Sequence, residues 1–393
     1  MSRLEELIQR YCPDGVEYVK LGDILGVNRG RRLTKNQLSA DGRYFVYHGS
    51  KDTPLGKYSQ YNVKGNTTIV VNTGGIGGVK FCDDDFWCSD GSFWIGHSPR
   101  LNDKFVYYYL SPKENYFASQ KRVGGVPTID RSVVENVEIP VPPMPVQEEI
   151  VRILDSFTEL QAELQAELQK RKQQYNYYLD NLLSFNDINR GGYREEVRWM
   201  KMSDICYKTN NIKWKTASRT YQYIDLTSVD IPTHSIISTV EIDRDTAPSR
   251  AQQIVKEKDI IFATTRPTQM RLCLIPAQYD GEICSTGYCV IRPNPAVLSP
   301  KYLFFALATE DFKAYLSNNL TLGNYPSISN AKLMEYEVPV PSMEEQTRIA
   351  GVLDRFDTLT NDLTTGLPAE IEKRQQQYEY YRDKLLAFKR KTA

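Results

Sequence analysis

Positively charged and amide side chains form the most informative chemical pattern in the chain. Between Lys20 and Lys80 there are ten Lys or Arg residues and only three Asp or Glu residues, although the whole chain has 49 of each. Lys and Arg bind phosphates, and Arg, Asn and Gln can also hydrogen-bond to base edges in the DNA major groove. This local cationic excess favours a nucleic-acid-binding surface, although a solvated charged face would have a similar composition.

The candidate DNA contacts lie in two regions, one in each half of the chain. They combine cations with Asn, Gln and Thr side chains, which are neutral donors and acceptors. In the first half they are Arg29, Arg31, Arg32, Lys35, Asn72, Thr73, Lys80 and Arg122. In the second half they are Asn210, Lys213, Lys215, Thr265, Arg266, Gln269 and Arg271.

Other reactive residue types are not spaced for catalysis or metal binding. The three histidines are far apart and form no H-E-x-x-H motif, and the seven cysteines include no C-x-x-C pair. The glycine-rich run at residues 72–78 lacks the ending of a phosphate loop, so a turn between strands is favoured. Asp83–Asp85 is expected to be a solvated acidic turn. We therefore predict no catalytic site, no metal and no cofactor in this chain.

The elements that must position the candidate residues occur twice. Pro140–Met144 and Gln147–Phe157 have counterparts at Pro339–Met343 and Gln346–Phe356, at an offset of 199 residues. Solenoid repeats are roughly 20–50 residues long, so this period indicates a duplicated domain. Outside the shared segments the two halves have little sequence similarity. The chain therefore alternates between variable regions and shared segments.

Each shared segment continues into a long stretch with helical periodicity. From Ile150 to Leu182, and again from Ile349 to Leu385, apolar residues recur in steps of three and four, which is typical of a heptad seam. The second copy has four extra residues, which include Gly366–Pro368 and predict a stutter and a kink. We expect the two helices to pair as an antiparallel coiled coil with approximate two-fold symmetry. The alternative is that each helix packs only on its own domain.

The variable regions are predicted to be mixed domains. Gly65–Asn72 and Lys258–Thr265 are β-rich runs that lead into polar turns, and short apolar stretches suit buried helices. We predict an α+β fold in which two domains with small β-sheets are separated by the two long helices. The predicted boundaries are 1–145 for the first domain, 146–190 for the first helix, 191–341 for the second domain and 342–393 for the second helix.

The remaining composition indicates a cytoplasmic protein. Seven cysteines without a pairing pattern suit free thiols in a reducing compartment. The first residues contain acids and no apolar core of a signal peptide, and no window approaches the ~18 apolar residues of a membrane span.

The repeated motifs resemble those of the specificity subunit of type I restriction-modification systems. The resemblance is carried by Pro140–Met144 with Gln147–Asp155, by their second copies, and by the tyrosine-rich helix ends Arg171–Tyr178 and Arg374–Tyr381. The two Gln-Ala-Glu-Leu units at residues 161–168 are similar to tandem tetrapeptides in one branch of that family. The likeness covers the whole chain, but the variable regions contain no transferable base-reading code.

The resemblance implies a non-catalytic subunit that recognises a bipartite DNA sequence, with one target-recognition domain for each half-site. It also implies two methyltransferase subunits as partners, which bind S-adenosylmethionine, and restriction subunits that use ATP and Mg. The helices would then set the spacing between the half-sites. Two alternatives stay open: the specificity subunit of a fused methylase-nuclease, and a cytoplasmic coiled-coil adaptor with protein-binding end domains.

Overall fold

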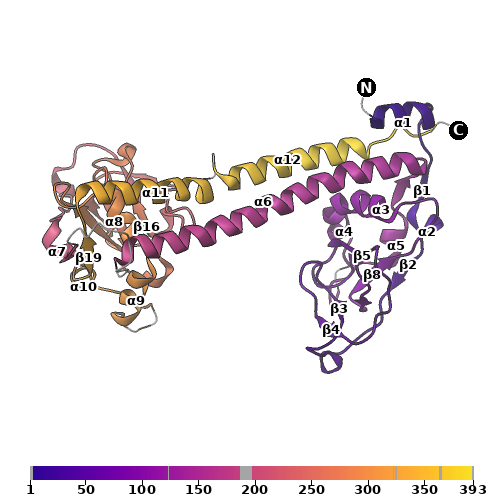
Figure 1. The fold of residues 1–393 in the computed structure, drawn as a ribbon, viewed down its shortest axis with the longest axis horizontal. Coiled ribbons are helices and arrows are strands. Elements are labelled where there is room, and N and C mark those ends of the chain that lie inside the picture. Colours follow the sequence, from indigo (N-terminus) through magenta and orange to yellow (C-terminus); the bar gives the residue numbers. More distant parts are fainter. Residues whose placement is uncertain are drawn as a thin grey trace, which may run out of the picture. The chain divides into compact units, whose positions relative to one another are not determined.

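The computed structural model describes residues 3–122, 124–185, 197–321, 323, 325–362 and 365–391. The chain divides into two compact units (Figure 1). Unit 1 consists of Met1–Glu163 and Lys373–Ala393, and unit 2 consists of Leu164–Glu372. Each unit therefore includes part of both repeat copies. The predicted boundary between residues 190 and 191 lies outside the described residues.

Unit 1 contains two small sheets. The larger is antiparallel, with the strand order β2 (Val27–Arg29), β8 (Ser92–Ile95), β5 (Thr67–Val71) and β6 (Val79–Cys82). The smaller has the order β4 (Gly56–Tyr58), β3 (Tyr44–Tyr47) and β7 (Trp87–Cys88), in which β3 and β7 run parallel. A separate antiparallel pair joins β1 (Tyr18–Lys20) to β9 (Glu138–Pro140).

Strand β5 forms the centre of unit 1, and all of its residues are buried. Alternate residues of a strand point to opposite faces. Val70 packs in the cluster that contains Phe105 of α3 (Asp103–Leu110), whereas Ile69 packs with Tyr47 and Phe86. The strand therefore fixes where its C-terminal loop begins. The other helices of unit 1 are α1 (Arg3–Tyr11), α2 (Leu21–Ile24), α4 (Glu114–Ser119) and α5 (Arg131–Glu135).

Unit 2 has a similar sheet arrangement, but its second sheet has a fourth strand. One sheet has the order β11 (Cys206–Tyr207), β18 (Tyr288–Pro293), β15 (Ile260–Ala263) and β16 (Leu272–Leu274). The other has the order β13 (Val240–Ile242), β12 (Tyr221–Ile224), β17 (Ile283–Ser285) and β14 (Ala251–Ile254), in which β12 and β17 run parallel like β3 and β7. Strands β10 (Arg198–Lys201) and β19 (Glu337–Val340) pair antiparallel. The unit also contains α7 (Met202–Ile205), α8 (Pro300–Ala306), α9 (Glu310–Asn318) and α10 (Asn330–Met334).

The duplication therefore extends into the variable regions as a shared topology, although their sequences differ. The predicted mixed fold with small sheets is confirmed.

The first long helix is α6 (Met144–Ser184), but the second copy is divided into α11 (Met343–Asn361) and α12 (Leu367–Leu385). The sequence predicted a stutter and a kink at Gly366–Pro368, and the helix is interrupted at this place. Pro368 occupies the first turn of α12, where its missing N–H is tolerated. A Cβ on Gly366 would lie 2.5 Å from the carbonyl oxygen of Thr358, so the break depends on a close backbone approach. None of the described helices is long and apolar enough to cross a membrane.

The two repeat copies contact each other within each unit. In unit 1, Phe157 of α6 stacks on Tyr381 of α12, and Gln161 Nε2 donates to Gln375 Oε1 at 2.7 Å. Later residues of α6 therefore contact earlier residues of α12, so the two helices run antiparallel here. In unit 2, Tyr178 of α6 stacks on Phe356 of α11. These contacts contradict the alternative in which each helix packs only on its own domain.

Candidate nucleic-acid interface

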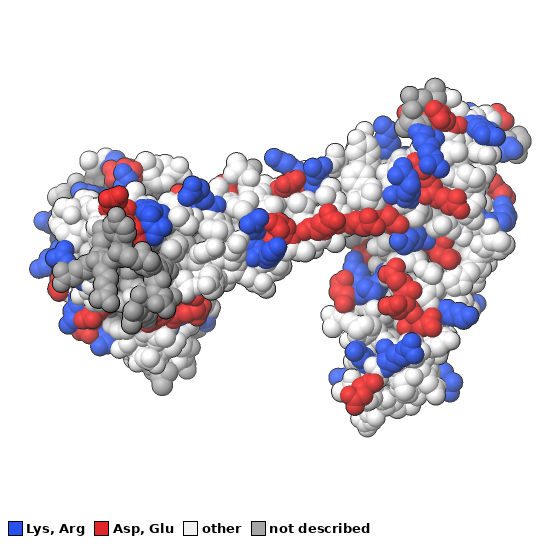
Figure 2. Space-filling model, in the orientation of Figure 1, with Lys and Arg blue, Asp and Glu red and all other residues white. Residues whose placement is uncertain are grey.

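Charges of both signs are intermixed on the face of the molecule shown in Figure 2. A basic surface therefore has to be identified from individual side chains and their partners. The most useful feature is an open groove of about 690 Å³ in unit 1. The segments that follow β2, β3, β5 and β7 converge there.

Close backbone contacts join two of the loops that carry residues lining this groove. Gly75 N donates to Gly49 O at 2.8 Å, which joins the loop after β5 to the loop after β3. Gly74 has φ +87°, and a Cβ there would lie 2.7 Å from Gly49 O. The glycine-rich run is thus a turn between strands β5 and β6, as the sequence predicted, and glycine is required because two backbones touch.

Three predicted cations line the groove: Arg29, Arg32 and Lys35. All three are exposed, and none lies within ion-pairing distance of a carboxylate in the described part of the chain. Lys35 begins a 3₁₀ turn that Thr34 and Gln37 cap reciprocally. Exposed cations without an acidic partner remain available for phosphates.

The opposite wall carries polar groups that the sequence did not single out. His48 and Asp90 line the groove together with Thr73 and Thr128. Gly91 N donates to His48 Nδ1 at 3.2 Å. Because an amide N–H can only donate, neutral His48 carries its proton on Nε2 and offers a donor there. His48 Nδ1 also lies 3.4 Å from Asp90 Oδ1, which is the longer contact.

The other first-half candidates occupy different positions. Thr73 Oγ1 donates to Thr128 Oγ1 at 3.3 Å on the groove wall. Arg31 is exposed beside the groove, and Arg122 is adjacent through its bridge to Thr128 but pairs with Asp130.

Asn72, also predicted as a DNA contact, is held by the protein itself. Its side chain is buried, with 1% exposed, and Nδ2 donates to Asp90 O at 3.2 Å. Asn72 therefore helps to hold the groove wall that Asp90 forms, because its side chain is buried and bonded to the Asp90 backbone.

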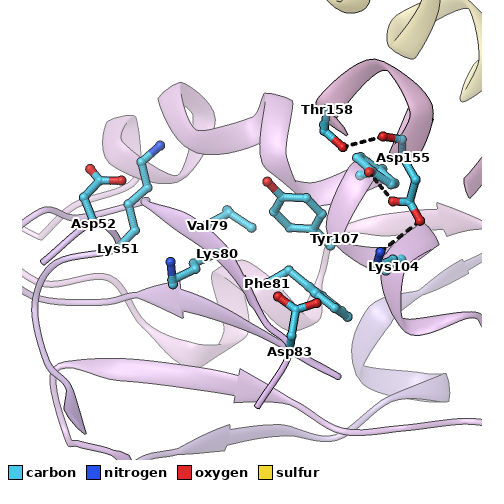
Figure 3. A pocket seen from close by; sticks show the side chains of 11 residues that line it. Lys51, Asp52, Val79, Lys80, Phe81, Asp83, Lys104, Tyr107, Asp155 and Thr158 are labelled. Atoms are coloured by element: carbon cyan, nitrogen blue, oxygen red, sulfur yellow. Dashed lines mark hydrogen bonds and ion pairs between the residues drawn. The ribbon is translucent and has the colours of Figure 1, made fainter. Parts of the chain in front are cut away.

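Lys80 lies outside the groove, in a separate recess of about 340 Å³ (Figure 3). The lysines of this recess already have partners. Lys51 pairs with Glu114 at 2.7 Å, Lys104 pairs with Asp155 at 2.9 Å, and Lys80 Nζ lies 5.4 Å from the centre of the Tyr47 ring. Burial, together with donation to Asp155, raises the pKa of Tyr108 in the same recess. The recess is a compensated charge network and a weaker candidate for phosphate binding.

Unit 2 contains the same loop framework. Thr264 N donates to Gly287 O, as Asn72 N donates to Gly91 O in unit 1. Thr265 bridges to Ser327, as Thr73 bridges to Thr128. The two loops are therefore equivalent in backbone pairing.

Arg266 is the clearest candidate in unit 2. It follows Thr265 at the position of Gly74 and has φ 51°. Its guanidinium lies 4.9 Å from the centre of the Tyr325 ring, which is 63% exposed. Gln269 is also exposed, at the end of the short 3₁₀ turn that follows Arg266.

The remaining second-half candidates divide into exposed and engaged residues. Asn210, Lys213 and Lys215 are exposed along the segment that borders β14, where Trp214 Nε1 donates to Ala251 O at 2.8 Å. Arg271 is the candidate that is engaged by the protein itself. It is half-buried, and Nη1 donates to the carbonyl oxygens of Leu226 and, at 2.8 Å, Val229.

Sequence reasoning missed His48, Asp90 and Tyr325. None of them lies in a charged run or a repeated motif, and they reach these positions only through contacts with distant segments. Among the described residues, no group of three or more His, Cys, Asp or Glu side chains could hold a metal ion.

Comparison with known proteins gives a consistent result. The family described as "Type I restriction modification DNA specificity domain" matches residues 13–171 and 194–373. The specificity subunit of the type I restriction enzyme EcoR124I/EcoR124II from Escherichia coli is 34% identical over 305 residues, covering 72% of this chain and 70% of that protein. A specificity subunit from Haemophilus influenzae is 27% identical over 399 residues, covering 95% and 96%.

Solved structures support the fold. The S subunit of a type I restriction-modification system from M. genitalium superposes with a TM-score of 0.62 at 16% identity, covering 95% of this chain and 96% of that one. A chain from a structure of a type I R-M system superposes with a TM-score of 0.55 at 17% identity, covering 95% and 98%.

Proposed function

The chain belongs to the type I restriction-modification DNA specificity family, and we propose that each of its units reads one half of a bipartite DNA target. Its role is DNA sequence recognition, because the curated relatives are named specificity subunits. The equivalent loop frameworks of the two units support one half-site per unit.

The groove of unit 1 is the observation that carries this proposal. Its three uncompensated cations suit backbone phosphates, which position a protein on the duplex without identifying bases. Its polar wall offers both donors and acceptors, which reading base edges requires. In unit 2, Arg266 and Tyr325 form the corresponding candidate surface.

We further propose that the shared helices act as spacer and dock. Two methyltransferase subunits would bind them and would supply S-adenosylmethionine, and restriction subunits using ATP and Mg would join this core. This chain would hold none of these groups itself, and the assembly would act in the cytoplasm. Co-purification separates this proposal from a fused methylase-nuclease, because the partner would then be a single chain with both activities.

Selection from a randomised duplex library tests DNA reading directly. The chain, purified with the methyltransferase that accompanies it, should enrich a motif with two conserved parts and an unspecified spacer. Its affinity should fall steeply with salt, since phosphate contacts release counterions. A protein-binding adaptor would enrich no motif.

A matched pair of triple variants tests the groove. Replacing Arg29, Arg32 and Lys35 with Ala should reduce the salt slope by roughly 0.9 per lost phosphate contact. Replacing Arg10, Lys20 and Lys64 with Ala removes the same charge from exposed positions outside the groove and should leave the slope nearly unchanged. Equal effects of the two variants would contradict the assignment of the groove.

A further inference from the structure

Asp90 gives the cationic groove of unit 1 an anionic wall. It lines the same groove as Arg29, Arg32 and Lys35, and its side chain is 29% exposed. No Lys or Arg in the described residues lies within 4 Å of its carboxylate, although Arg29 Nε donates to its backbone carbonyl at 3.3 Å. A surface built only to bind phosphates would exclude such a group, because it repels them.

The backbone of Asp90, rather than its carboxylate, holds this wall. Asp90 O accepts from Arg29 Nε and also from Asn72 Nδ2 at 3.2 Å. Of the carboxylate, Oδ1 accepts from Ser89 Oγ at 3.1 Å and lies near His48, while Oδ2 has no recorded partner among the described residues. One oxygen is therefore open to a ligand in the groove.

The chemistry of an ionised carboxylate limits what this ligand can be. It can only accept hydrogen bonds. In the major groove the only base groups that donate are the exocyclic amino groups, N6 of adenine and N4 of cytosine, whereas guanine and thymine edges and phosphates present acceptors.

From this geometry, and resting on the proposed function, we propose that Asp90 determines specificity by accepting a hydrogen bond from the exocyclic amino group of an adenine or cytosine in one half-site. His48 lines the same groove, and its neutral ring donates from Nε2 when Nδ1 accepts from Gly91 N. An acceptor next to a donor complements the N6 and N7 atoms of adenine.

A double-mutant cycle, in which one change is made in the protein and the other in the DNA, tests this pairing. Every base pair presents one amino group in the major groove, so a change of motif alone does not identify the contact. The probes are duplexes carrying the enriched motif, in which amino groups are removed one at a time by replacing adenine with purine or cytosine with 2-pyrimidinone. One removal should weaken binding of the wild-type chain by roughly 5- to 150-fold and weaken binding of Asp90→Ala by less than about 2-fold.

Asp84→Ala is the matched control. It removes the same charge from an exposed turn that does not line the groove, and it should respond to each amino removal like the wild type. Because the side chain of Asp90 contacts Ser89, Asp90→Asn provides a second variant that keeps the size of the side chain. Asp90→Asn should bind only weakly to the unmodified duplex that contains the amino group required by the wild type.

Other outcomes overturn the inference. In one, Asp90→Ala weakens binding to every duplex equally, which would make Asp90 a structural residue. In the other, every amino removal weakens binding by the wild type and by Asp90→Ala to the same extent. A failure of the proposed function is recognised separately, because the wild-type chain would then enrich no motif.

Discussion

The ring of Phe157 stacks on the ring of Tyr381, with centroids 5.6 Å apart and an interplanar angle of 27°. Phe157 belongs to the first repeat copy and Tyr381 to the second. Unit 2 contains the reciprocal contact, in which Phe356 stacks on Tyr178 at 5.4 Å and also at 27°. Each copy therefore supplies the phenylalanine of one stack and the tyrosine of the other.

The stack in unit 1 should show measurable coupling. In a double-mutant cycle of Phe157→Ala and Tyr381→Ala, we expect an interaction free energy of about 0.5–1.5 kcal/mol, which is typical of an aromatic pair. This interaction free energy is measured by urea unfolding, monitored by circular dichroism. A parallel cycle of Phe157→Ala with Tyr380→Ala should give nearly zero, because Tyr380 is 62% exposed. Equal coupling in the two cycles would contradict the specific pairing.

Replacing Arg266 with Gly should separate stability from DNA binding. The left-handed backbone at Arg266, φ 51°, costs an L-residue about 1 kcal/mol, and Gly74 occupies the equivalent place in unit 1. We expect Arg266→Gly to unfold at a temperature no lower than the wild type, yet to bind DNA more weakly and with a smaller salt slope.

Lys258→Gly is the control for Arg266→Gly. Lys258 also has a positive φ, 69°, and is exposed, but it precedes β15 whereas Arg266 follows that strand. It should leave DNA affinity unchanged. Weaker binding by Lys258→Gly to the same degree would show that general charge, not the position of Arg266, accounts for the effect.

Buried thiols should make the protein sensitive to alkali. Burial raises the pKa of Cys82, Cys206, Cys273 and Cys289 from an ordinary value of 9.0 to about 12. The folded state therefore keeps protons that the unfolded state releases above pH 9. Their contribution to stability is fully present below pH 9 and is lost as the pH rises toward about 12.

Unfolding in urea at pH 8, 9, 10 and 11 checks this expectation. The contribution of these thiols to the free energy of unfolding should be constant between pH 8 and 9. It should fall above pH 9. Cys82→Ala should make that fall shallower. An equally steep loss in the variant would show that this thiol does not keep its proton in the folded state.

The length of the first spacer helix should set the spacing of the target. Adding one Gln-Ala-Glu-Leu unit next to residues 161–168 lengthens a helix by about 6 Å, against ~3.4 Å per base pair. We expect the enriched motif to keep both half-sites and to gain one or two base pairs between them. Altered half-sites with an unchanged spacer would contradict the proposal that the helix sets the spacing.

Much of the fold could be predicted because its signals are local. The heptad steps of Ile150–Leu182 and the paired Pro-rich segments follow from residues close together in sequence. The division of the second helix was only partly predicted. Gly366–Pro368 marked the place, but the complete break depends on the close approach of Gly366 to the Thr358 carbonyl.

The sequence alone determined the duplication, the long helices and the type of side chains available for DNA, because these depend on composition and periodicity. The tertiary structure decided which of those side chains are usable. Asn72 and Arg271 had the right chemistry but are engaged by backbone groups from distant segments, whereas Asp90 and His48 carried no sequence signal and line the groove. Exposure and hydrogen-bond partners are set by loops that meet only after the sheets form, so no local pattern could encode them.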